Sequence, residues 1–290
     1  MNRRSALFAL HLGALFFGLS GIFGKLALAA PLVIVFGRAL FAVAALMVFN
    51  RLGEKPARIT WQRCLALAGA GLLLGGHWWS FFIAVKVSGV AIATLGFASF
   101  PAFTVLLEGV LFKERIRLAE WGVVALVCLG LVLVTPHFDF GSDATLGLGW
   151  AVVSGLLFAL VSVSNRATTQ GLKPAQAALW QNLGIVLCTL PLAAPLLPEV
   201  RAMDWLWIAL LGLLCTALAH SLFVASLRVL NARSASVVFA LEPVYGIAFA
   251  WWLFNEQPGL RMLFGGVLIM LATVLSARLN KHNPSVEDLS

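Results

Sequence analysis

A carboxylate and a proline stand side by side in the stretch FALEPVYGIAFAWW, residues 239–252, which is otherwise almost entirely apolar. An ionised carboxylate within such a run is costly unless it faces a partner or water, and it often marks a functional site. Glu242 could bind a cationic group of a ligand, carry a proton, or form a structural ion pair. Its candidate partner is Arg38, the only Arg or Lys deep within an apolar run.

Two histidines offer a second kind of chemistry. His77 precedes Trp78 in the stretch GGHWWSFF, and His220 stands at the position that a repeat described below pairs with Trp78. Imidazole titrates near neutrality, so either ring could shuttle protons or bind a carboxylate. For each histidine the alternative is a buried ring that is simply hydrogen-bonded. Tryptophan adds flat apolar area and one hydrogen-bond donor, which suits a ligand with a large apolar side chain.

Composition indicates what kind of segment must position these groups. The chain has 290 residues, of which 61% are hydrophobic and only 11% are charged, whereas about a quarter of the residues in soluble domains are charged. The basic residues outnumber the acidic ones, but they are dispersed and form no stripe that would bind nucleic acid. We therefore expect an integral membrane protein that does not bind nucleic acid.

The spacing of cysteine, histidine and aspartate argues against several enzyme classes. The four cysteines form no C-x-x-C pair, so neither a disulfide framework nor a zinc site is indicated. The histidines are scattered and form no H-E-x-x-H motif. The aspartates all lie outside the apolar runs. We expect no enzymatic activity, no cofactor and no metal.

Apolar runs of about 20 residues, the length that crosses a bilayer as a helix, recur ten times. The expected spans are residues 5–27, 32–50, 64–86, 89–112, 118–136, 147–168, 175–197, 204–227, 232–254 and 260–278. The first run follows Arg3 and Arg4 and resembles a signal peptide, but it exceeds the about 7–15 apolar residues of a signal core. We expect it to be retained, which gives an all-α polytopic membrane protein with ten transmembrane helices.

The distribution of Lys and Arg predicts the orientation, because cytoplasmic loops retain positive charge. With the N-terminus inside, 15 of the 20 basic residues fall on inner connections. The outer connections hold only Lys25, Lys86, Arg201 and Arg261. Both termini are therefore expected in the cytoplasm.

The chain also contains an internal repeat. Residues 97–118, FASFPAFTVLLEGVLFKERIRL, align without a gap with residues 239–260, FALEPVYGIAFAWWLFNEQPGL, at an offset of 142. Pro101 matches Pro243, and Glu114 matches Glu256. Each half contributes an odd number of spans, so the second half enters the membrane from the opposite side. Inverted repeats with a binding site near the midplane are characteristic of secondary transporters.

We expect two five-helix repeats, residues 5–136 and 147–278, followed by a short cytoplasmic tail, residues 279–290. Ten spans in this arrangement, with paired prolines and the boxes FKER and FNEQ, resemble the EamA type of the drug/metabolite transporter superfamily. The resemblance implies a central cavity lined by spans 1, 3, 4, 6, 8 and 9, and export of small metabolites or amino acids across the bacterial inner membrane. No G-x-x-x-x-G-K-[ST] loop is present, in agreement with transport that ATP does not drive directly.

The paired prolines help to place this cavity. Each lies near the centre of its span and removes a backbone hydrogen bond, so the freed carbonyl must face protein or a water-filled space. Pro101 and Pro243 are therefore expected to point inward, although a kink that serves packing alone is the alternative. Glu108 lies on the same face as Pro101, two turns on, and either lines the cytoplasmic end or is satisfied by a hydroxyl or Lys113.

Smaller polar groups complete the expected lining: Ser99, Asn165, Gln181 and Tyr245. A cavity with an arginine, carboxylates, histidines and aromatic rings would recognise both ends of a zwitterion and its apolar side chain. We therefore expect an amino acid or related small molecule as substrate, with protons as a candidate coupling ion. The protein could act as a monomer or homodimer in the bilayer. A lipid scramblase or a multidrug efflux protein is the alternative, because a wide apolar cavity could also admit lipid.

Overall fold

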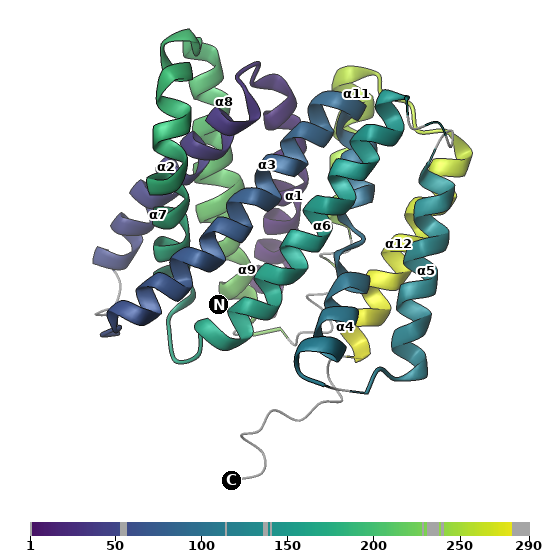
Figure 1. Cartoon of the computed structure of the whole chain (residues 1–290), viewed down its shortest axis with the longest axis horizontal. Helices are drawn as coiled ribbons and strands as arrows, with labels where there is room; N and C mark the ends of the chain where they lie inside the picture. The colour runs from purple at the N-terminus through teal and green to yellow at the C-terminus, as the bar shows by residue number, and fades with distance from the viewer. Residues whose placement is uncertain are drawn as a thin grey trace.

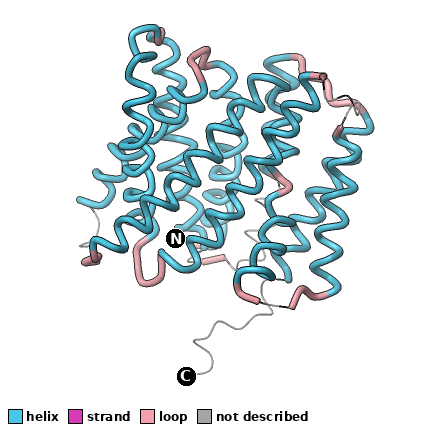
Figure 2. The backbone as a smooth tube through the Cα atoms, in the orientation of Figure 1, coloured by secondary structure: helices cyan, strands magenta, loops and turns pink. Residues whose placement is uncertain are grey.

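The computed structural model describes residues 2–52, 57–113, 115–135, 139, 141–227, 229–230, 238 and 241–279. Within these ranges every regular element is a helix (Figures 1 and 2). Glu114 and almost all of the expected tail, residues 280–290, lie outside the described part of the chain.

The first half contains five helices that follow the expected spans closely. They are α1 (Arg3–Leu26), α2 (Pro31–Leu52), α3 (Trp61–Phe97), α4 (Phe100–Leu111) and α5 (Leu118–Val134). The boundary between the third and fourth spans differs from the expectation, because α3 runs on to Phe97 and is broken only at Gly89. Gly89 has φ 86° and ψ 172°, a left-handed conformation that glycine adopts without steric cost.

The second half repeats this order with one irregular helix. Its elements are α6 (Asp143–Thr168), α7 (Pro174–Ala193), η1 (Ala194–Glu199), α8 (Ala202–Gly212), η2 (Leu213–Leu218), α9 (Ala219–Leu227), α11 (Glu242–Phe254) and α12 (Leu260–Leu279). The eighth span thus consists of α8, the π-helical turn η2 and α9 in direct succession. Of the ninth span, the structure describes mainly the part in α11.

The two prolines do not kink continuous helices. Pro101 lies in the first turn of α4, and Pro243 lies in the first turn of α11. Proline is tolerated there because the amide that it lacks would have no intrahelical acceptor. The expected loss of a hydrogen bond in mid-helix is therefore wrong. The fourth span is instead interrupted at Ala98 and Ser99, and Pro101 starts the next helix.

The helix packing fits two repeats. α3 and α4 pack on α6, whereas α9 and α11 pack on α1; α2 packs on α7, and α5 packs on α12 (Figure 1). If α1 corresponds to α6, the eighth span to α3 and α11 to α4, each of these contacts has a counterpart in the other half. Seven helices in the described ranges are each long and apolar enough to cross a membrane, while α4 and α5 are shorter.

The contacts between connecting segments fall into two groups, one at each end of the bundle. At one end, Arg63 donates to the carbonyl oxygens of Thr168 and Gln170, and Arg117 donates to that of Leu279. At the other end, Lys25 pairs with Glu256. Each group joins segments that the charge pattern predicts to lie on one side of the membrane, so the contacts agree with that grouping.

Candidate substrate site

Arg38 lies in the interior of the bundle, on α2, with only 4% of its surface exposed. Its Nε donates to Thr216 Oγ1 over 2.8 Å, and one terminal nitrogen donates to Ser20 Oγ over 3.0 Å. The guanidinium also lies over the Trp78 ring, 4.1 Å from the centroid. Arginine stacks well on aromatic faces. All these partners are neutral, so they orient the guanidinium, and no ion pair to Arg38 forms within the described residues.

The π-helical turn η2 explains how Thr216 reaches Arg38. The Thr216 hydroxyl donates to the carbonyl of Leu211, five residues earlier, over 3.0 Å. A π-helical turn shifts the helix register by one residue, and such turns are common at functional sites. On the neighbouring turn, a Cβ on Gly212 would lie 2.6 Å from the Arg38 carbonyl oxygen. The glycine therefore allows α8 to approach α2 closely.

Glu242 begins α11 and lies beside the middle of α1. A Cβ on Gly18 would lie 2.8 Å from the Glu242 carbonyl oxygen, so the two backbones meet at that glycine. Glu242 stays partly exposed although the adjoining Pro243 is buried. Within the described residues no ion pair joins it to Arg38, although the two charges attract each other.

His77 connects α3 to α6 and is 7% exposed. Its Nδ1 lies 2.7 Å from Ser154 Oγ, and that hydroxyl also lies within donating distance, 3.1 Å, of the His77 carbonyl oxygen. The rings of Phe97 and Phe158 pack on the imidazole, with centroids 4.9 and 5.0 Å away. Hydrogen bonding and aromatic packing on this scale match the alternative given above, a buried and satisfied histidine.

The helix break before α4 joins this aromatic cluster. Phe100, which the repeat pairs with Glu242, stacks on Phe97 at 5.4 Å and meets Phe158 edge-on at 5.2 Å. Next to it, Ser99 is 1% exposed, and within the described part of the chain its hydroxyl has no hydrogen-bond partner. We call Phe97, Phe100 and Phe158, from α3, α4 and α6, the aromatic wall of the candidate site. We call Arg38 of α2 and Glu242 of α11 its charged wall.

Glu108, Asn165 and Gln181 lie closer to the end of the bundle that carries Arg63 and Arg117. Gln181 donates to Asn165 Oδ1 over 2.6 Å, which ties α7 to α6. Glu108 pairs with Arg166 at 3.4 Å. We expected a hydroxyl or Lys113 as the structural partner of Glu108. The structure provides a basic partner, which is Arg166 and not Lys113.

Tyr245 and His220 occupy the second half of the site. The Tyr245 hydroxyl lies 3.2 Å from Nδ1 of the exposed His11, in a contact between α11 and α1. His220 lies in the first turn of α9 and is partly exposed. It forms no hydrogen bond to any residue that the structure describes.

Sequence reasoning missed Ser20, Thr216 and Ser154. The available signal was a hydroxyl side chain within an apolar span.

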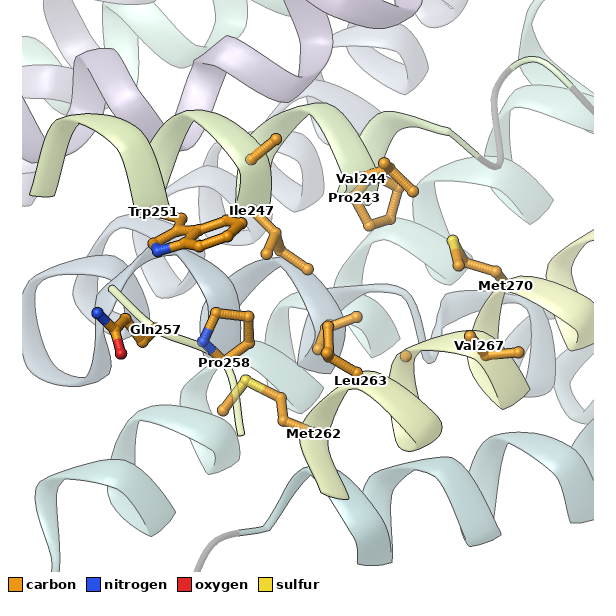
Figure 3. Close-up of a pocket in the computed structure, with 13 residues that line it drawn as sticks. Pro243, Val244, Ile247, Trp251, Gln257, Pro258, Met262, Leu263, Val267 and Met270 are labelled. Atoms are coloured by element: carbon orange, nitrogen blue, oxygen red, sulfur yellow. The ribbon is translucent and has the colours of Figure 1, made fainter. Parts of the chain in front are cut away.

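A separate cavity of about 450 Å³ lies between α11 and α12 (Figure 3). From α11 it is lined by Pro243, Val244, Ile247 and Trp251, and from α12 by Met262 and Leu263 among others. Leu95 of α3 also contributes to its lining. Trp251 is 58% exposed, so the cavity opens at the surface of the bundle. We call it the lateral groove. Among the expected site residues, only Pro243 lines it.

The two halves of the chain each match a known protein family. Residues 4–135 and residues 145–278 match the EamA-like transporter family. The chain belongs to this family. The family and the names of its relatives indicate a multi-pass membrane transporter of small molecules and not an enzyme.

Curated relatives of this EamA-like transporter have names of different kinds. An uncharacterized transporter of Archaeoglobus fulgidus is 28% identical over 204 residues, covering 69% of this chain and 71% of the relative. A pseudopaline exporter of Pseudomonas aeruginosa is 26% identical over 259 residues, covering 86% of each chain. An S-adenosylmethionine uptake transporter of Rickettsia conorii is 24% identical over 208 residues, covering 70% and 68%.

A solved crystal structure aligns with the EamA-like transporter over 98% of this chain and 100% of that chain. The TM-score is 0.65 and the sequence identity is 19%. This likeness shows the fold alone. Since the named relatives include both an uptake transporter and an exporter, neither the direction of transport nor the substrate follows from family membership.

Proposed function

We propose that this EamA-like transporter is a secondary transporter that exports amino acids or closely related metabolites across the bacterial inner membrane by alternating access. The observation that carries the proposal is the charged wall. Arg38 is a buried cation whose direct contacts are to neutral groups, and Glu242 is a partly exposed carboxylate. A zwitterion presents a carboxylate and an ammonium group, which complement these two charges.

The aromatic wall supports the same substrate class. Phe97 and Phe100 of the first repeat pack with Phe158 of the second repeat and form an apolar cluster at the helix break. An apolar or aromatic side chain of the substrate would pack there, because aromatic rings combine large contact areas with specific geometry. A sugar phosphate would find neither a second cation nor polar hydroxyl partners on this wall.

The orientation follows from the charge pattern. We place both termini in the cytoplasm, with repeats at residues 5–136 and 147–278 and the tail at residues 279–290. Glu242 is the group that we assign to substrate amine binding or to proton coupling. In this arrangement a site at the junction of two inverted repeats is exposed to either side in turn.

The test is counterflow of radiolabelled amino acids in liposomes at several pH values, with Glu242→Gln and Glu108→Gln compared with the parent protein. Both substitutions remove a carboxylate, but Glu108 already pairs with Arg166 away from the charged wall. We expect saturable exchange in the parent protein, a selective loss in Glu242→Gln and little change in Glu108→Gln. Normal exchange by Glu242→Gln with unchanged pH dependence would remove Glu242 from the mechanism.

The lateral groove favours a second candidate, the transport of lipid or of lipophilic drugs. Its lining is almost wholly apolar, and it lies between α11 and α12 beside the exposed Trp251 (Figure 3). Scrambling of fluorescent phospholipids in the same liposomes separates the two functions. Lipid scrambling without amino-acid exchange would favour the second candidate, and exchange without scrambling would favour the first.

A further inference from the structure

Three segments that are distant in sequence meet at the predicted outer end of the bundle. Lys25 lies in the last turn of α1, Gly89 breaks α3, and Glu256 follows α11. Lys25 Nζ lies 2.5 Å from Glu256 Oε1. The same carboxylate accepts hydrogen bonds from the backbone amides of Val90, over 3.2 Å, and Ala91, over 3.1 Å. One carboxylate of the second repeat therefore binds two separate elements of the first.

The conformation at Gly89 creates the binding site for this carboxylate. Because the backbone turns there, the helix starts again at Val90, and the first amides of a helix have no intrahelical acceptors. A carboxylate at that position satisfies these amides and interacts favourably with the helix dipole. A Cβ on residue 89 would lie 2.9 Å from the Glu256 carboxyl carbon. Glycine is thus needed for the positive φ and also for the close approach of Glu256.

Further contacts bring the end of α1 into the same cluster. Lys25 Nζ lies 4.7 Å from the centroid of the Phe254 ring. Lys86 donates to the carbonyl of Ala27, and the Leu28 amide donates to Asp204 Oδ1 over 2.8 Å. The connections after α1 and α11 and the turn within α3 are therefore joined across this end of the protein.

We propose that Lys25, Glu256 and the amides of Val90 and Ala91 form an outer latch, which is closed in this structure and opens to release substrate. The inference rests on the proposed function of alternating access. The outer latch joins the first repeat to the second at a site remote from the charged wall. Glu242 and Glu256 are separated by 14 residues, or about 20 Å along a helix at 1.5 Å per residue. Glu256 is therefore a positioning residue that does not contact the substrate.

An ion pair at the opposite end of the bundle provides a matched control. Glu120 also accepts from a cation, Arg117, at 2.8 Å, and from a backbone amide, that of Arg117, over 2.7 Å. Among the described residues, Glu120 itself hydrogen-bonds only to Arg117. Arg117 in turn donates to the Leu279 carbonyl of the second repeat, at the end of the bundle away from the outer latch. Glu256→Gln and Glu120→Gln make the same chemical change in the two settings.

The experiment measures a distance between spin labels across the outer end, in lipid nanodiscs. The labels are attached at Leu28→Cys and Gly259→Cys, in a chain whose four native cysteines are replaced by alanine. Leu28 is exposed, and a Cβ on Gly259 would meet no other atom. We expect a short distance in the parent, an added population at longer distances in Glu256→Gln and Lys25→Met, and the parent distribution in Glu120→Gln.

Distances in Glu256→Gln that coincide with those of the parent would overturn the proposal, even with a lower melting temperature, because Glu256 would then be only a structural cap. If Glu256→Gln does not fold, Lys25→Met decides by the same criterion, since it leaves the helix cap intact. The distances require no substrate. Opening without amino-acid exchange would therefore contradict the proposed function alone, and exchange with unchanged distances would contradict the outer latch alone.

Discussion

The two helix breaks that the repeat relates to each other have the same backbone design and opposite chemistry. In the first half, Ser99 and Phe100 precede Pro101 at the start of α4. In the second half, Leu241 and Glu242 precede Pro243 at the start of α11. The first break is filled by aromatic rings, while the second carries a partly exposed carboxylate. The scaffold is symmetric, and the chemistry lies where the symmetry is broken.

The third and eighth spans differ in a related way. Residues 71–76 of α3 are regular α-helix and include Gly71, which packs against the Gln181 backbone. The counterpart at an offset of 142 is the π-helical turn η2, Leu213–Leu218, which presents Thr216 to Arg38. Regular helix therefore serves close packing in one half, and irregular helix positions a charge in the other.

The largest effect is expected from Arg38, because it alone supplies the positive charge of the charged wall. Arg38→Met should weaken amino-acid binding by about 2–3 kcal/mol, or roughly 30- to 150-fold, by analogy with the loss of a buried charge partner. Arg38→Lys keeps the charge but loses the planar fork and the stacking on Trp78, so it should rescue binding only partly. Equilibrium binding measures both, and full rescue by lysine would show that the stacked geometry is unimportant.

Phe100→Ala tests how much the aromatic wall contributes to stability and to substrate binding. The substitution removes ring contacts with Phe97 and Phe158, and we expect about 2 kcal/mol of destabilisation, below the usual cost of a fully buried phenylalanine because Phe100 is only partly buried. The melting temperature in detergent should fall. Binding of glycine, which has no side chain to pack there, should change less than binding of phenylalanine. Equal losses for both amino acids would argue against contact between this wall and the substrate.

Glu242→Gln should show the opposite pattern to Phe100→Ala. We expect amino-acid binding to fall about tenfold, or about 1.4 kcal/mol, while the melting temperature is unchanged or rises because a charge is removed from the interior. Binding and thermal unfolding measured on the same preparation check this. A large loss of stability would instead assign Glu242 to a structural role.

The smallest effect is expected at Ser154, whose hydroxyl holds the His77 ring. Ser154→Ala should cost about 1 kcal/mol of stability, the usual worth of a hydrogen bond, with little change in transport or in its pH dependence. A shifted pH profile of counterflow in Ser154→Ala would mean that His77 titrates during the cycle, and the aromatic wall would then also carry protons.

Much of the fold could be predicted from local properties of the chain. The helices follow the apolar runs, and the contacts at the two ends join segments that the pattern of Lys and Arg residues places together. Which end lies in the cytoplasm stays a prediction. The exceptions lie at Gly89, where a single glycine replaces a loop, and at η2, where no sequence pattern signals a π-helical turn.

The partners within the candidate site could not be predicted in this way. Arg38 suggested an ion pair with Glu242, but it is held by Ser20 and Thr216, and His77 is enclosed by rings from α3 and α6. Hydropathy and charge act along the chain and determine which segments enter the membrane and on which side each connection lies. Which faces of the helices meet depends on their rotation and close packing. That choice couples residues more than a hundred positions apart, and only the tertiary structure decides it.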